Sequence, residues 1–410
     1  MAIVGAGAAG LATAIFVRRL NASRSVVLLD GAKKPGAKIL ISGGSRCNVT
    51  NASVTERDFW GGRPAIVRRV LGGFPVHDTI AFFEQMGVRL HEEADGKLFP
   101  NTNRSRDVLD ALLREVQAVG AALHAECRVL AVTPMDGRFD VQTSRGLVHA
   151  AGVVLATGGR SLPKTGSDGL GIEIARGLGH RIVPPTPALV PLLLAGGDEA
   201  LHRDLAGVSQ PVELSVWIDG RVAARLEGAL LWTHFGISGP VALNASRHWI
   251  RAREEGRSVA VTVNFCRGEP FDAVDRQLTA LSAQRPNASI QHALASFVPA
   301  RVAATLLARL RIDGGMARSH FSRADRRRLA HALVEWPLAI VGTRGYNFAE
   351  VTAGGVALDE IDPSTMESRV CPGLWLVGEM LDVDGRIGGF NFQWSWASAR
   401  VAAAALASSG

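Results

Sequence analysis

The chain has 410 residues, too many for one hydrophobic core of ordinary size, so we expect two or three domains. Its content of 47% hydrophobic and 20% charged residues is typical of a globular protein, and no run approaches the roughly 18 apolar residues of a membrane span. The net charge of +7 invites nucleic-acid binding. The basic residues are spread along the chain, however, and acids are nearly as numerous, so no specific nucleic-acid partner and no membrane partner are predicted.

The cysteines argue for a reducing environment and against a metal site. Four of them, Cys47, Cys127, Cys266 and Cys371, are scattered along the chain. They form neither a C-x-x-C pair nor a cluster with metal-ligand spacing. The first strand begins directly after Met1, so we expect no signal peptide and a cytoplasmic location.

The first thirty residues carry the strongest motif. The short apolar run at residues 2–4 predicts a buried strand, which leads through G-A-G-A-A-G at residues 5–10 into an apolar-periodic helix over residues 11–20. A second apolar run at residues 26–29 ends in Asp30, 20 positions after the last glycine. Strand, G-x-G-x-x-G, helix, strand and acid form the fingerprint of a dinucleotide-binding fold, in which the acid accepts hydrogen bonds from the ribose.

Each residue of the glycine motif has an expected task. Gly5 permits a tight turn, Gly7 lets the backbone approach a pyrophosphate, and Gly10 lets the helix pack against the strand. Ala8 and Ala9, between these glycines, are further candidate cofactor-binding residues, and the free N–H groups of the helix N-terminus face the phosphates. A glycine turn without a ligand is the alternative, which the surrounding strands and acid disfavour. The motif by itself does not choose between NAD and FAD.

A basic loop and a polar run follow Asp30. Small residues, an arginine and several amide or hydroxyl groups are concentrated between residues 38 and 51, a composition that suits a backbone wrapped around a polar ligand. A surface loop held by side-chain to backbone hydrogen bonds explains the pattern equally well. The candidate ligand-binding residues of this run are Lys38, Ser42, Gly43, Arg46 and Asn48.

The middle of the chain changes character twice. Helices are predicted over residues 78–87 and 105–120, then an antiparallel meander over residues 128–149. A buried strand at residues 152–156 ends in Thr157 and Gly158, which bring bare backbone to the edge of a sheet.

Beyond the prolines at 184–187, three segments read as antiparallel strands of a barrel: residues 212–218, 221–226 and 258–265. Two helical stretches then suggest an insert: residues 271–310 and 323–335, the second opened by an S-x-x-D capping box at Ser322.

The chain closes with a second strand–glycine–helix unit. Residues 374–377 form a buried strand, and a helix is expected from Asn391 to about residue 407. Its N-terminus would face the C2 carbonyl of a flavin and stabilise negative charge there. The alternative is an ordinary strand–helix pair of the same sheet. The candidate ligand-binding residues of this unit are Gly378, Glu379, Asp382, Gly388, Gly389, Phe390 and Asn391.

These motifs together resemble a known family. The ordered matches are the glycine fingerprint, Lys38 with S-G-G-S-R-C-N at 42–48, A-T-G-G at 156–159 with P-K-T-G at 163–166, T-H-F-G-I-S-G-P at 233–240, V-T-A-G-G-V at 351–356, T-M-E-S at 365–368, and the block from Gly378 to Trp394. They are similar to the two-dinucleotide-fold flavoproteins of the BaiN/YhiN type, aminoacetone-oxidase-like NAD(P)/FAD-dependent oxidoreductases. The resemblance covers almost the whole chain. This sequence departs from it at Phe390, where tyrosine is common, and at Asp30, where many flavoproteins carry glutamate.

The resemblance implies an α/β fold: a glutathione-reductase-like FAD domain with inserted β-barrel and helical domains. The FAD domain would comprise residues 1–185 and 342–410, the barrel 186–268 and 336–341, and the helical insert 269–335. The implied enzyme moves a hydride between a small or medium organic substrate and N5 of noncovalent FAD. NAD(P)H as a transient co-substrate, or oxygen, would complete the cycle, although no second G-x-G-x-x-G motif is present. The alternative is a flavin-binding sensor, or an RNA-associated binding protein, whose flavin does not turn over.

Three residues are candidates for the chemistry itself. Cys47 could act beside the flavin, although a small packing residue is the simpler interpretation. His234, expected in a polar loop between barrel and insert, could serve as an acid or base. Tyr346, with Arg344, lies where the chain is expected to re-enter the FAD domain and could bind an anionic substrate. The alternatives are a structural histidine at position 234 and an ordinary surface turn at Arg344 and Tyr346.

Overall fold

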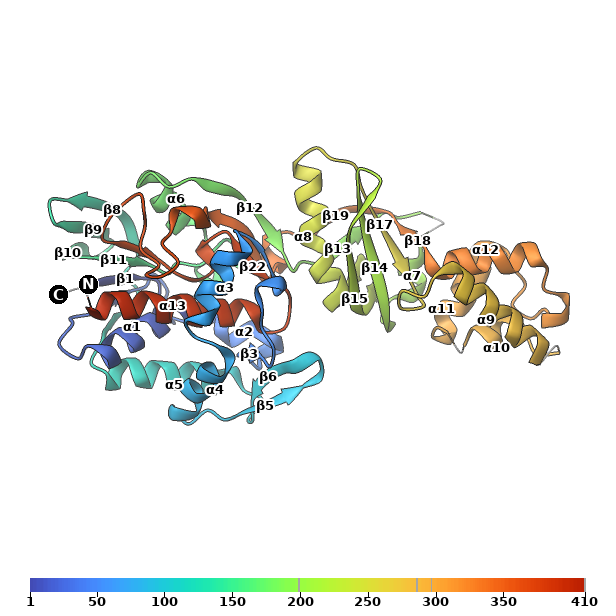
Figure 1. Cartoon of the computed structure of the whole chain (residues 1–410), viewed down its shortest axis with the longest axis horizontal. Helices are drawn as coiled ribbons and strands as arrows, with labels where there is room; N and C mark the ends of the chain where they lie inside the picture. The colour runs from blue at the N-terminus through green and yellow to red at the C-terminus, as the bar shows by residue number, and fades with distance from the viewer. Residues whose placement is uncertain (198–199, 285–286, 296, 409–410) are drawn as a thin grey trace. The chain divides into compact units, whose positions relative to one another are not determined.

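The structure is a computed structural model that describes residues 1–197, 200–284, 287–295 and 297–408 (Figure 1). It divides into two compact units. The first comprises Met1–Pro187 and Ala349–Gly410, and the second Ala188–Phe348. The first unit is therefore discontinuous in sequence. The second unit is inserted in the chain between β12 (Ile182–Ala188) and β20 (Val351–Val356). Residues 342–348 belong to the second unit, and the finer separation of a barrel domain from a helical domain stays a prediction.

A five-stranded parallel sheet forms the centre of the first unit. Its strands, in spatial order, are β21 (Leu374–Leu376), β11 (Val153–Leu155), β1 (Ala2–Val4), β2 (Val27–Leu29) and β7 (Ala122–His124). Every residue of β1, β11 and β21 is buried, because helices and loops cover both faces of the sheet. Short runs of valine, isoleucine and leucine are what such doubly covered strands require. The predicted α/β fold is confirmed.

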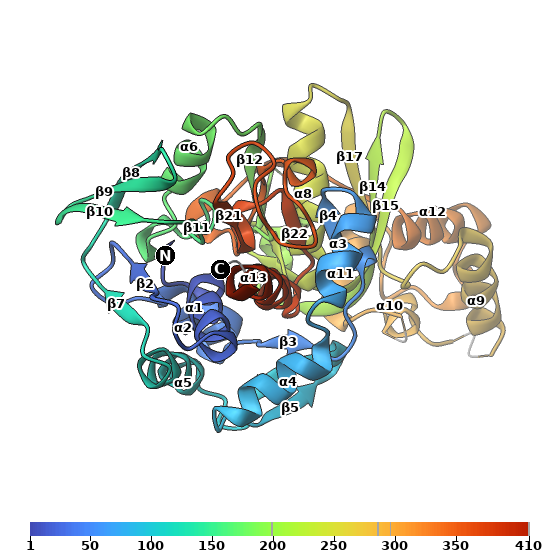
Figure 2. The same ribbon diagram turned by 60° about the vertical axis from the view of Figure 1, so that its left-hand side comes forward.

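Two helices from opposite ends of the chain pack together beside this sheet. Helix α1 (Ala8–Leu20) and helix α13 (Phe390–Ser408) lie side by side (Figure 2). Helix α13 buries the indole rings of Trp394 and Trp396, and the indole N–H of Trp396 donates to the carbonyl oxygen of Val49 at 2.9 Å. The C-terminal helix is therefore part of the core of this unit.

The remaining elements of the first unit surround that core. Its other helices are α2 (Ala37–Ser45), α3 (Pro64–Gly72), α4 (Val76–Gln85), α5 (Ser105–Ala118) and α6 (Leu170–Gly177). Its smaller sheets are β8–β9–β10 (Val129–Met135, Arg138–Thr143, Gly146–Ala150), β3–β6–β5 (Thr50–Asn51, Lys97–Pro100, Leu90–Glu93), β22–β4 (Val383–Gly385, Phe59–Gly61) and β12–β20 (Ile182–Ala188, Val351–Val356). The antiparallel meander predicted over residues 128–149 is confirmed.

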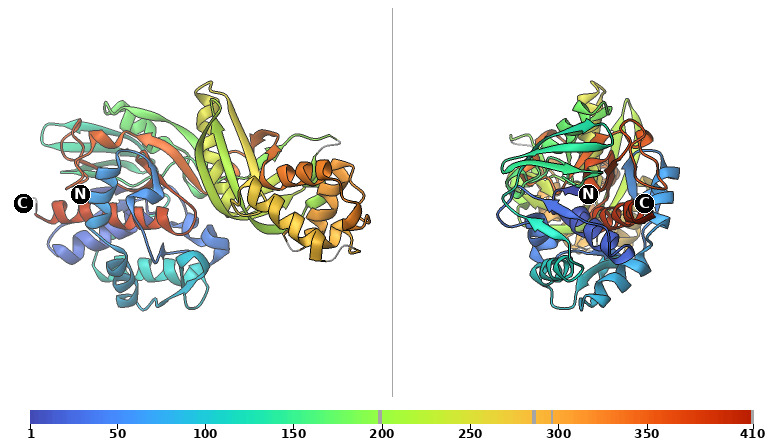
Figure 3. Two further views of the ribbon diagram at one scale, coloured as in Figure 1. Left: turned by 45° about the vertical axis from the view of Figure 1, so that its right-hand side comes forward. Right: turned by 90° about the vertical axis from the view of Figure 1, so that its left-hand side faces the viewer.

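The second unit is built on a seven-stranded antiparallel sheet (Figure 3). Its order is β18 (Trp336–Leu338), β17 (Val259–Asn264), β14 (Ser209–Ile218), β15 (Arg221–Thr233), β16 (Gly236–Ser238), β13 (Leu192–Leu194) and β19 (Ile340–Thr343). The two edge strands, β18 and β19, are separated in the chain by Ala339 alone, so the sheet has to curl until its edges approach each other. Helix α8 (Pro240–Glu254) packs on β14 and β15. This curled sheet is the predicted barrel.

Helices make up the rest of the second unit: α7 (Leu201–Leu205), α9 (Phe271–Gln284), α10 (Ile290–Leu294), α11 (Ala300–Leu310) and α12 (Arg323–Val334). Ser322 caps α12 as its sequence predicts, accepting from the N–H of Asp325 at 3.0 Å. In the arginine run of α12, Arg326 pairs with Asp275 at 2.9 Å and Arg328 pairs with Asp325 at 2.8 Å. These partners lie in the same unit, as expected for an ordinary helix face. No helix in the described ranges is long and apolar enough to cross a membrane.

Acid should destabilise the second unit through His248 on α8. Burial, assisted by the charge of Arg247, lowers the pKa of His248 from 6.5 to about 4. The unfolded chain therefore binds a proton between these two pH values that the folded chain does not. The contribution of neutral His248 to the free energy of unfolding is fully present above pH 6.5. It is lost as the pH falls toward about 4, by about 3 kcal/mol in total. Denaturant titrations at a series of pH values should show this loss in the wild-type protein. This loss should be absent from the His248→Gln variant. If the free energy of unfolding depends on pH equally in the variant and in the wild-type protein, the assignment to His248 is contradicted.

Candidate functional site

The predicted ligand-binding segments meet at one edge of the parallel sheet. Strands β1, β11 and β21 are neighbours that run in the same direction, so the loops after them leave the same edge. The strand pairing extends one residue beyond the strand ends. The N–H of Ala156 donates to the carbonyl oxygen of Val4 at 2.9 Å, and the N–H of Val377 donates to that of Leu155 at 3.1 Å. Ligands of open α/β sheets bind outside this carboxyl edge.

The three glycines of the fingerprint differ in what surrounds them. Gly5 has φ +98°, and a Cβ there would lie 2.6 Å from the carbonyl oxygen of Ala156. A Cβ on Gly10 would lie 1.9 Å from the carbonyl oxygen of Gly5. A Cβ on Gly7, by contrast, would meet no atom within 4 Å. The fold itself requires Gly5 and Gly10, whereas Gly7 faces open space at the start of α1.

That open space fits the pyrophosphate of a dinucleotide. Gly7 is the N-cap of α1, and no side chain caps this helix end. The first-turn N–H groups and the positive end of the helix dipole are thus available to an anion. The sequence supplies no acid in the first turn of α1 that would repel one.

Asp30 fastens the glycine loop to the end of β2. One carboxylate oxygen accepts from the N–H of Ala6 at 2.6 Å and the other from the N–H of Ala32 at 2.8 Å. A carboxylate can accept about four hydrogen bonds, so both oxygens retain capacity for ribose hydroxyls. The structure therefore adds a role in loop geometry to the predicted contact with ribose.

Replacing Asp30 should separate these two roles. Asp30→Ala removes a charge-assisted acceptor, which should weaken FAD binding by about 1.5–3 kcal/mol, or about 10- to 150-fold. Asp30→Asn keeps an acceptor oxygen for one backbone N–H but removes the charge, and should bind FAD with intermediate affinity. Fluorescence titration of the flavin-free variants measures both constants. Unchanged affinity in Asp30→Ala would reject the assignment.

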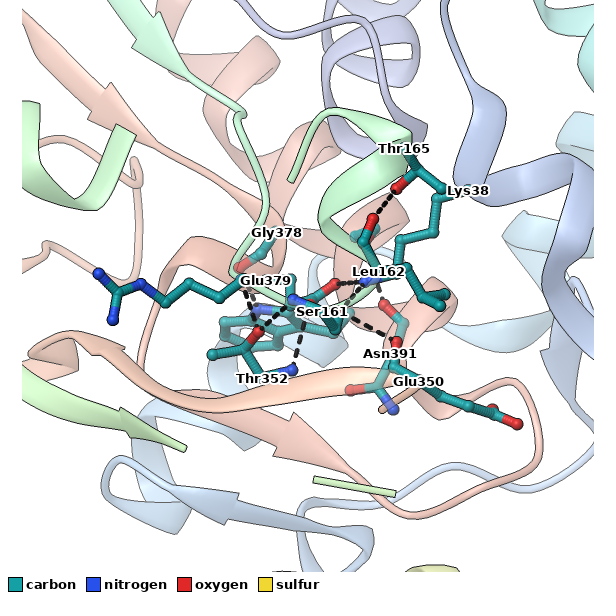
Figure 4. Close-up of polar contacts among 12 residues, drawn as sticks. Lys38, Ser161, Leu162, Thr165, Glu350, Thr352, Gly378, Glu379 and Asn391 are labelled. Carbon is teal, nitrogen blue, oxygen red and sulfur yellow. Dashed lines mark hydrogen bonds and ion pairs between the residues drawn. The ribbon is translucent and has the colours of Figure 1, made fainter. Parts of the chain in front are cut away.

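A partly buried polar network joins α2, the segment after β11, β20 and the segment after β21 (Figure 4). The ammonium group of Lys38, on α2, donates to the hydroxyl of Ser161 and to the carboxylate of Glu379, each at 2.5 Å. The other carboxylate oxygen of Glu379 accepts from the Ser161 hydroxyl at 2.9 Å and from the N–H of Thr352 at 3.0 Å. Only 14% of the Glu379 side chain and 26% of the Lys38 side chain are exposed. Lys38 and Glu379, predicted as separate ligand contacts, form one ion pair.

Sequence reasoning did not assign Ser161 and Thr352, which complete this network. The Thr352 hydroxyl accepts from the N–H groups of Arg160 at 2.7 Å and Ser161 at 3.1 Å. A Cβ on Gly159 would lie 2.3 Å from that hydroxyl oxygen, so the third residue of T-G-G makes room for Thr352. Thr352 lies within the V-T-A-G-G-V motif of the family resemblance, and Ser161 lies between two of its other motifs; these positions are their only signal in the sequence.

Two predicted contact residues have buried polar atoms without a partner among the described residues. These atoms are the hydroxyl oxygen of Thr157, directly after β11, and the side-chain oxygen of Asn48. Buried polar groups are normally hydrogen-bonded, and an orphan calls for an explanation such as a bound ligand. Gly158, with φ +70°, allows the backbone to turn between Thr157 and the network. The orphaned atoms and the space before Gly7 both fit a polar cofactor at this sheet edge.

The polar run from residue 42 to 48 is more strongly tied to its own surroundings than to open space. The Ser42 hydroxyl donates to the carbonyl oxygen of Ile39 at 2.8 Å, and a Cβ on Gly43 would lie 2.9 Å from the backbone nitrogen of Asn48. Arg46 pairs with Glu93 at 2.7 Å, and its guanidinium lies 4.0 Å from the ring centroid of Phe99. A role of these residues in cofactor binding stays a prediction.

Cys47 lies fully buried at the end of this run. Burial raises the pKa of its thiol to about 12. The thiol therefore stays protonated at neutral pH, and a protonated thiol is a poor nucleophile. This environment favours the packing interpretation over a redox role.

The C-terminal loop is fixed between the glycine loop and β3. A Cβ on Gly378 would lie 2.9 Å from the Cβ of Ala9, which places this loop against the first turn of α1. The side-chain amide of Asn391 both accepts from Gly385, at 2.8 Å, and donates to its carbonyl oxygen, at 2.9 Å. A Cβ on Gly389, where φ is +93°, would lie 2.4 Å from the carbonyl carbon of Thr50.

This packing changes the interpretation of two glycines. Gly389 was expected to make room for a flavin, but its close neighbour is the backbone of β3. Gly388, with φ +125°, lies near the ring of Phe390, and its carbonyl oxygen accepts from the amide of Asn51 at 3.1 Å. Asp382 joins the loop to its neighbours through its backbone, donating to Val356 and accepting from Gly62, both at 2.8 Å.

The remaining candidates for chemistry lie in the second unit. His234 is exposed in the two-residue turn between β15 and β16, within the sheet. The prediction that it lies between barrel and insert is wrong, because β15 extends to Thr233, seven residues beyond the predicted end of its strand. Tyr346 lies in a short 3₁₀ helix, η5 (Tyr346–Phe348), after β19. The structure does not assign chemistry to either side chain.

A parallel sheet with a G-x-G-x-x-G loop, an uncapped helix N-terminus and an acid at the end of the second strand defines a Rossmann-type dinucleotide-binding fold. The chain belongs to the family described as the HI0933-like protein Rossmann domain, whose model matches residues 1–405.

Similar proteins of known name extend over the full length of the chain. The chain is 34% identical to the ribosomal RNA dihydrouridine synthase of Escherichia coli over 97% of this chain and 95% of the relative. It is 32% identical to the 3-dehydro-bile acid delta(4,6)-reductase of Clostridium scindens over 99% and 98%, respectively. A quinol-fumarate reductase shares the fold, with a TM-score of 0.50, 15% identity and coverage of 99% of this chain and 70% of that one. The protein is accordingly an enzyme, a flavin-dependent oxidoreductase.

Proposed function

We propose that the protein uses noncovalent FAD to add a hydride and a proton across a carbon–carbon double bond conjugated to a carbonyl group. The names of the two relatives support this reaction class. Dihydrouridine differs from uridine by two hydrogens on a ring double bond next to a carbonyl, and a delta(4,6)-reductase of a 3-dehydro-bile acid acts on double bonds in the same electronic setting. The shared chemistry is reduction of an electron-poor double bond.

The observation that carries the proposal is the meeting of three strand ends around the open space before Gly7. In this proposal, the first-turn N–H groups of α1 bind the pyrophosphate, and Asp30 binds the ribose of the adenosine. Thr157 and Asn48 supply polar atoms that have no partner among the described residues. When bound, FAD supplies the hydride-transfer chemistry itself.

The Lys38–Glu379 pair has a positioning role in this proposal. Glu379 lies in the short 3₁₀ helix after β21, and Lys38 lies on the helix after the basic loop, so their contact fixes two of the segments around the cofactor relative to each other. Ser161, after β11, ties a third segment to the same pair. The network thereby holds three segments in one arrangement: α2, the segment after β11 and the segment after β21.

Reduction and reoxidation of the coloured protein test the proposed function. Under anaerobic conditions, NADPH or NADH should bleach the flavin absorbance. A substrate with a conjugated enone should restore it and gain two hydrogens, as measured by mass spectrometry. Oxygen is the alternative acceptor, and recovery in air without any enone would assign that role to it. Failure of both nicotinamides and of a panel of enones to change the flavin spectrum would contradict the proposal.

A binding protein with RNA as its partner is the second candidate, favoured by the name of the 34% identical relative. Its flavin would not turn over. Electrostatic RNA binding would weaken steeply with salt. Filter binding with ribosomal RNA at physiological salt, repeated with Arg326→Glu and Arg328→Glu together, tests whether α12 takes part. Micromolar or weaker binding that the double change does not affect would exclude this helix as an RNA site.

A further inference from the structure

An arginine in contact with two aromatic rings lies outside the candidate cofactor site. Arg344 directly follows β19, in the second unit. Its guanidinium carbon lies 3.4 Å from the ring centroid of Phe348 and 4.7 Å from that of Phe235. Phe348 is 46% exposed, and His234, also exposed, packs edge-on against Phe235 with ring centroids 5.1 Å apart. Four side chains from two separate segments thus form one surface cluster.

The topology of the sheet brings these segments together. Strands β16 and β19 pair with opposite sides of β13. The turn before β16 is anchored by a hydrogen bond from Leu194 to the carbonyl oxygen of Phe235 at 3.1 Å. The N–H of Arg344 donates to the carbonyl oxygen of Pro191 at 3.2 Å. Both segments are therefore held by the same strand and its flanks.

The guanidinium of Arg344 is oriented but not neutralised. Other arginines of this unit form ion pairs with carboxylates, such as Arg257 with Asp219 and Arg309 with Asp204. Across the described residues, Arg344 has ring contacts and no carboxylate within ion-pair distance. Both rings lie within cation–π distance of the guanidinium, whose N–H groups keep their capacity to donate to a ligand. These donors match the two oxygens of a carboxylate or phosphate group.

We propose that Arg344 is the binding site for an oxyanion ligand on the second unit, with Phe235 and Phe348 holding the guanidinium in its binding orientation. The proposal goes beyond the proposed function, because it assigns an anion-binding site to the second unit by itself. The substrates named for the two relatives share this chemistry, since a bile acid carries a carboxylate and RNA carries phosphodiesters. A stacked arginine loses little conformational freedom when it binds, which favours it over a mobile surface cation.

The test uses the FAD-bound protein and three probes. The first is a 3-oxo-4,6-diene steroid with a side-chain carboxylate, the second is the methyl ester of the same steroid, and the third is a short oligouridylate. Dissociation constants are measured from changes in the flavin spectrum or from fluorescence anisotropy, without turnover. Whichever anionic probe binds the wild-type protein identifies the source of the oxyanion.

The expected result is selective for charge. Arg344→Gln should weaken binding of that anionic probe by about 10- to 150-fold, the loss of one charge-assisted hydrogen-bonding group. It should leave the constant for the methyl ester unchanged. Arg344→Lys should recover only part of the loss, because an ammonium cannot reproduce the planar fork. Arg221→Gln, an exposed arginine at the opposite end of β15 from His234, is the matched control and should change nothing.

Two results would overturn the proposal: equal affinity of wild-type and Arg344→Gln protein for the anionic probe, or no binding of either anionic probe by the wild type. Equal losses for acid and ester would also contradict it, because they would show a packing role. Binding that depends on Arg344 without any reduction of the bound probe would support the oxyanion site. That result would count against the proposed reductase function alone.

Discussion

Glu379→Gln should lower the free energy of unfolding of the first unit by up to about 3 kcal/mol, the low end of the cost of breaking a fully buried ion pair, because this pair is partly buried. The change leaves the ammonium group of Lys38 without its carboxylate while only 26% of the lysine side chain is exposed. It also converts an acceptor for Ser161 and Thr352 into an amide. Chemical denaturation of the flavin-free protein measures the loss.

Two controls separate the ion pair from a general effect of substitution. Lys38→Met combined with Glu379→Gln removes both charges and should cost less than Glu379→Gln alone, because no uncompensated ammonium remains. Asp219→Asn breaks the exposed pair between Arg257 and Asp219, whose side chains are 47% and 51% exposed, and should change the free energy of unfolding much less, because solvent screens exposed pairs. A single Glu379→Gln change as mild as Asp219→Asn would show that the partly buried network does not stabilise the unit.

Gly7→Val should remove the flavin and leave the fold intact. The new side chain would enter space in which no protein atom lies within 4 Å of its Cβ, and φ at this residue is negative. If the pyrophosphate occupies that space, affinity for FAD should fall by at least about 10- to 150-fold, the loss of one charge-assisted hydrogen bond. Flavin content and melting temperature of the flavin-free protein are measured on the same preparation.

Two further glycine variants complete this comparison. Gly177→Val also enters open space, at the end of α6, and should retain full flavin. Gly10→Val should destabilise the fold with or without cofactor, because its Cβ would lie 1.9 Å from the carbonyl oxygen of Gly5. A Gly7→Val protein that binds FAD like the wild type would show that the cradle before α1 is not the pyrophosphate site.

The fingerprint could be predicted from sequence because every part of it is local. Strand, glycine loop, helix and acid lie within thirty residues, and the tight environments of Gly5 and Gly10 match the roles expected of them. The same argument did not extend to Gly389. A sequence shows that a glycine is present but not whether its open side faces a ligand, as at Gly7, or the backbone of another strand, as at Gly389.

Pairing between distant residues was the main feature that sequence reasoning missed. Lys38 and Glu379 are 341 positions apart, and Ser161 and Thr352 are 191 apart, so no local pattern could indicate that they meet. His234 was misplaced for a different reason. The strand predicted from the sequence ends at residue 226, whereas the pairing between β14 and β15 continues to Leu231.

Identifying the released chromophore tests the central claim most directly, because the glycine fingerprint is a device for binding the ADP half of a dinucleotide. The purified protein should be yellow, or should become yellow and remain so after incubation with FAD and removal of the excess. Denaturation should then release FAD, identified by chromatography and mass spectrometry, in a stoichiometry near one per chain. A protein that stays colourless with excess FAD, or that releases FMN alone, would contradict the account.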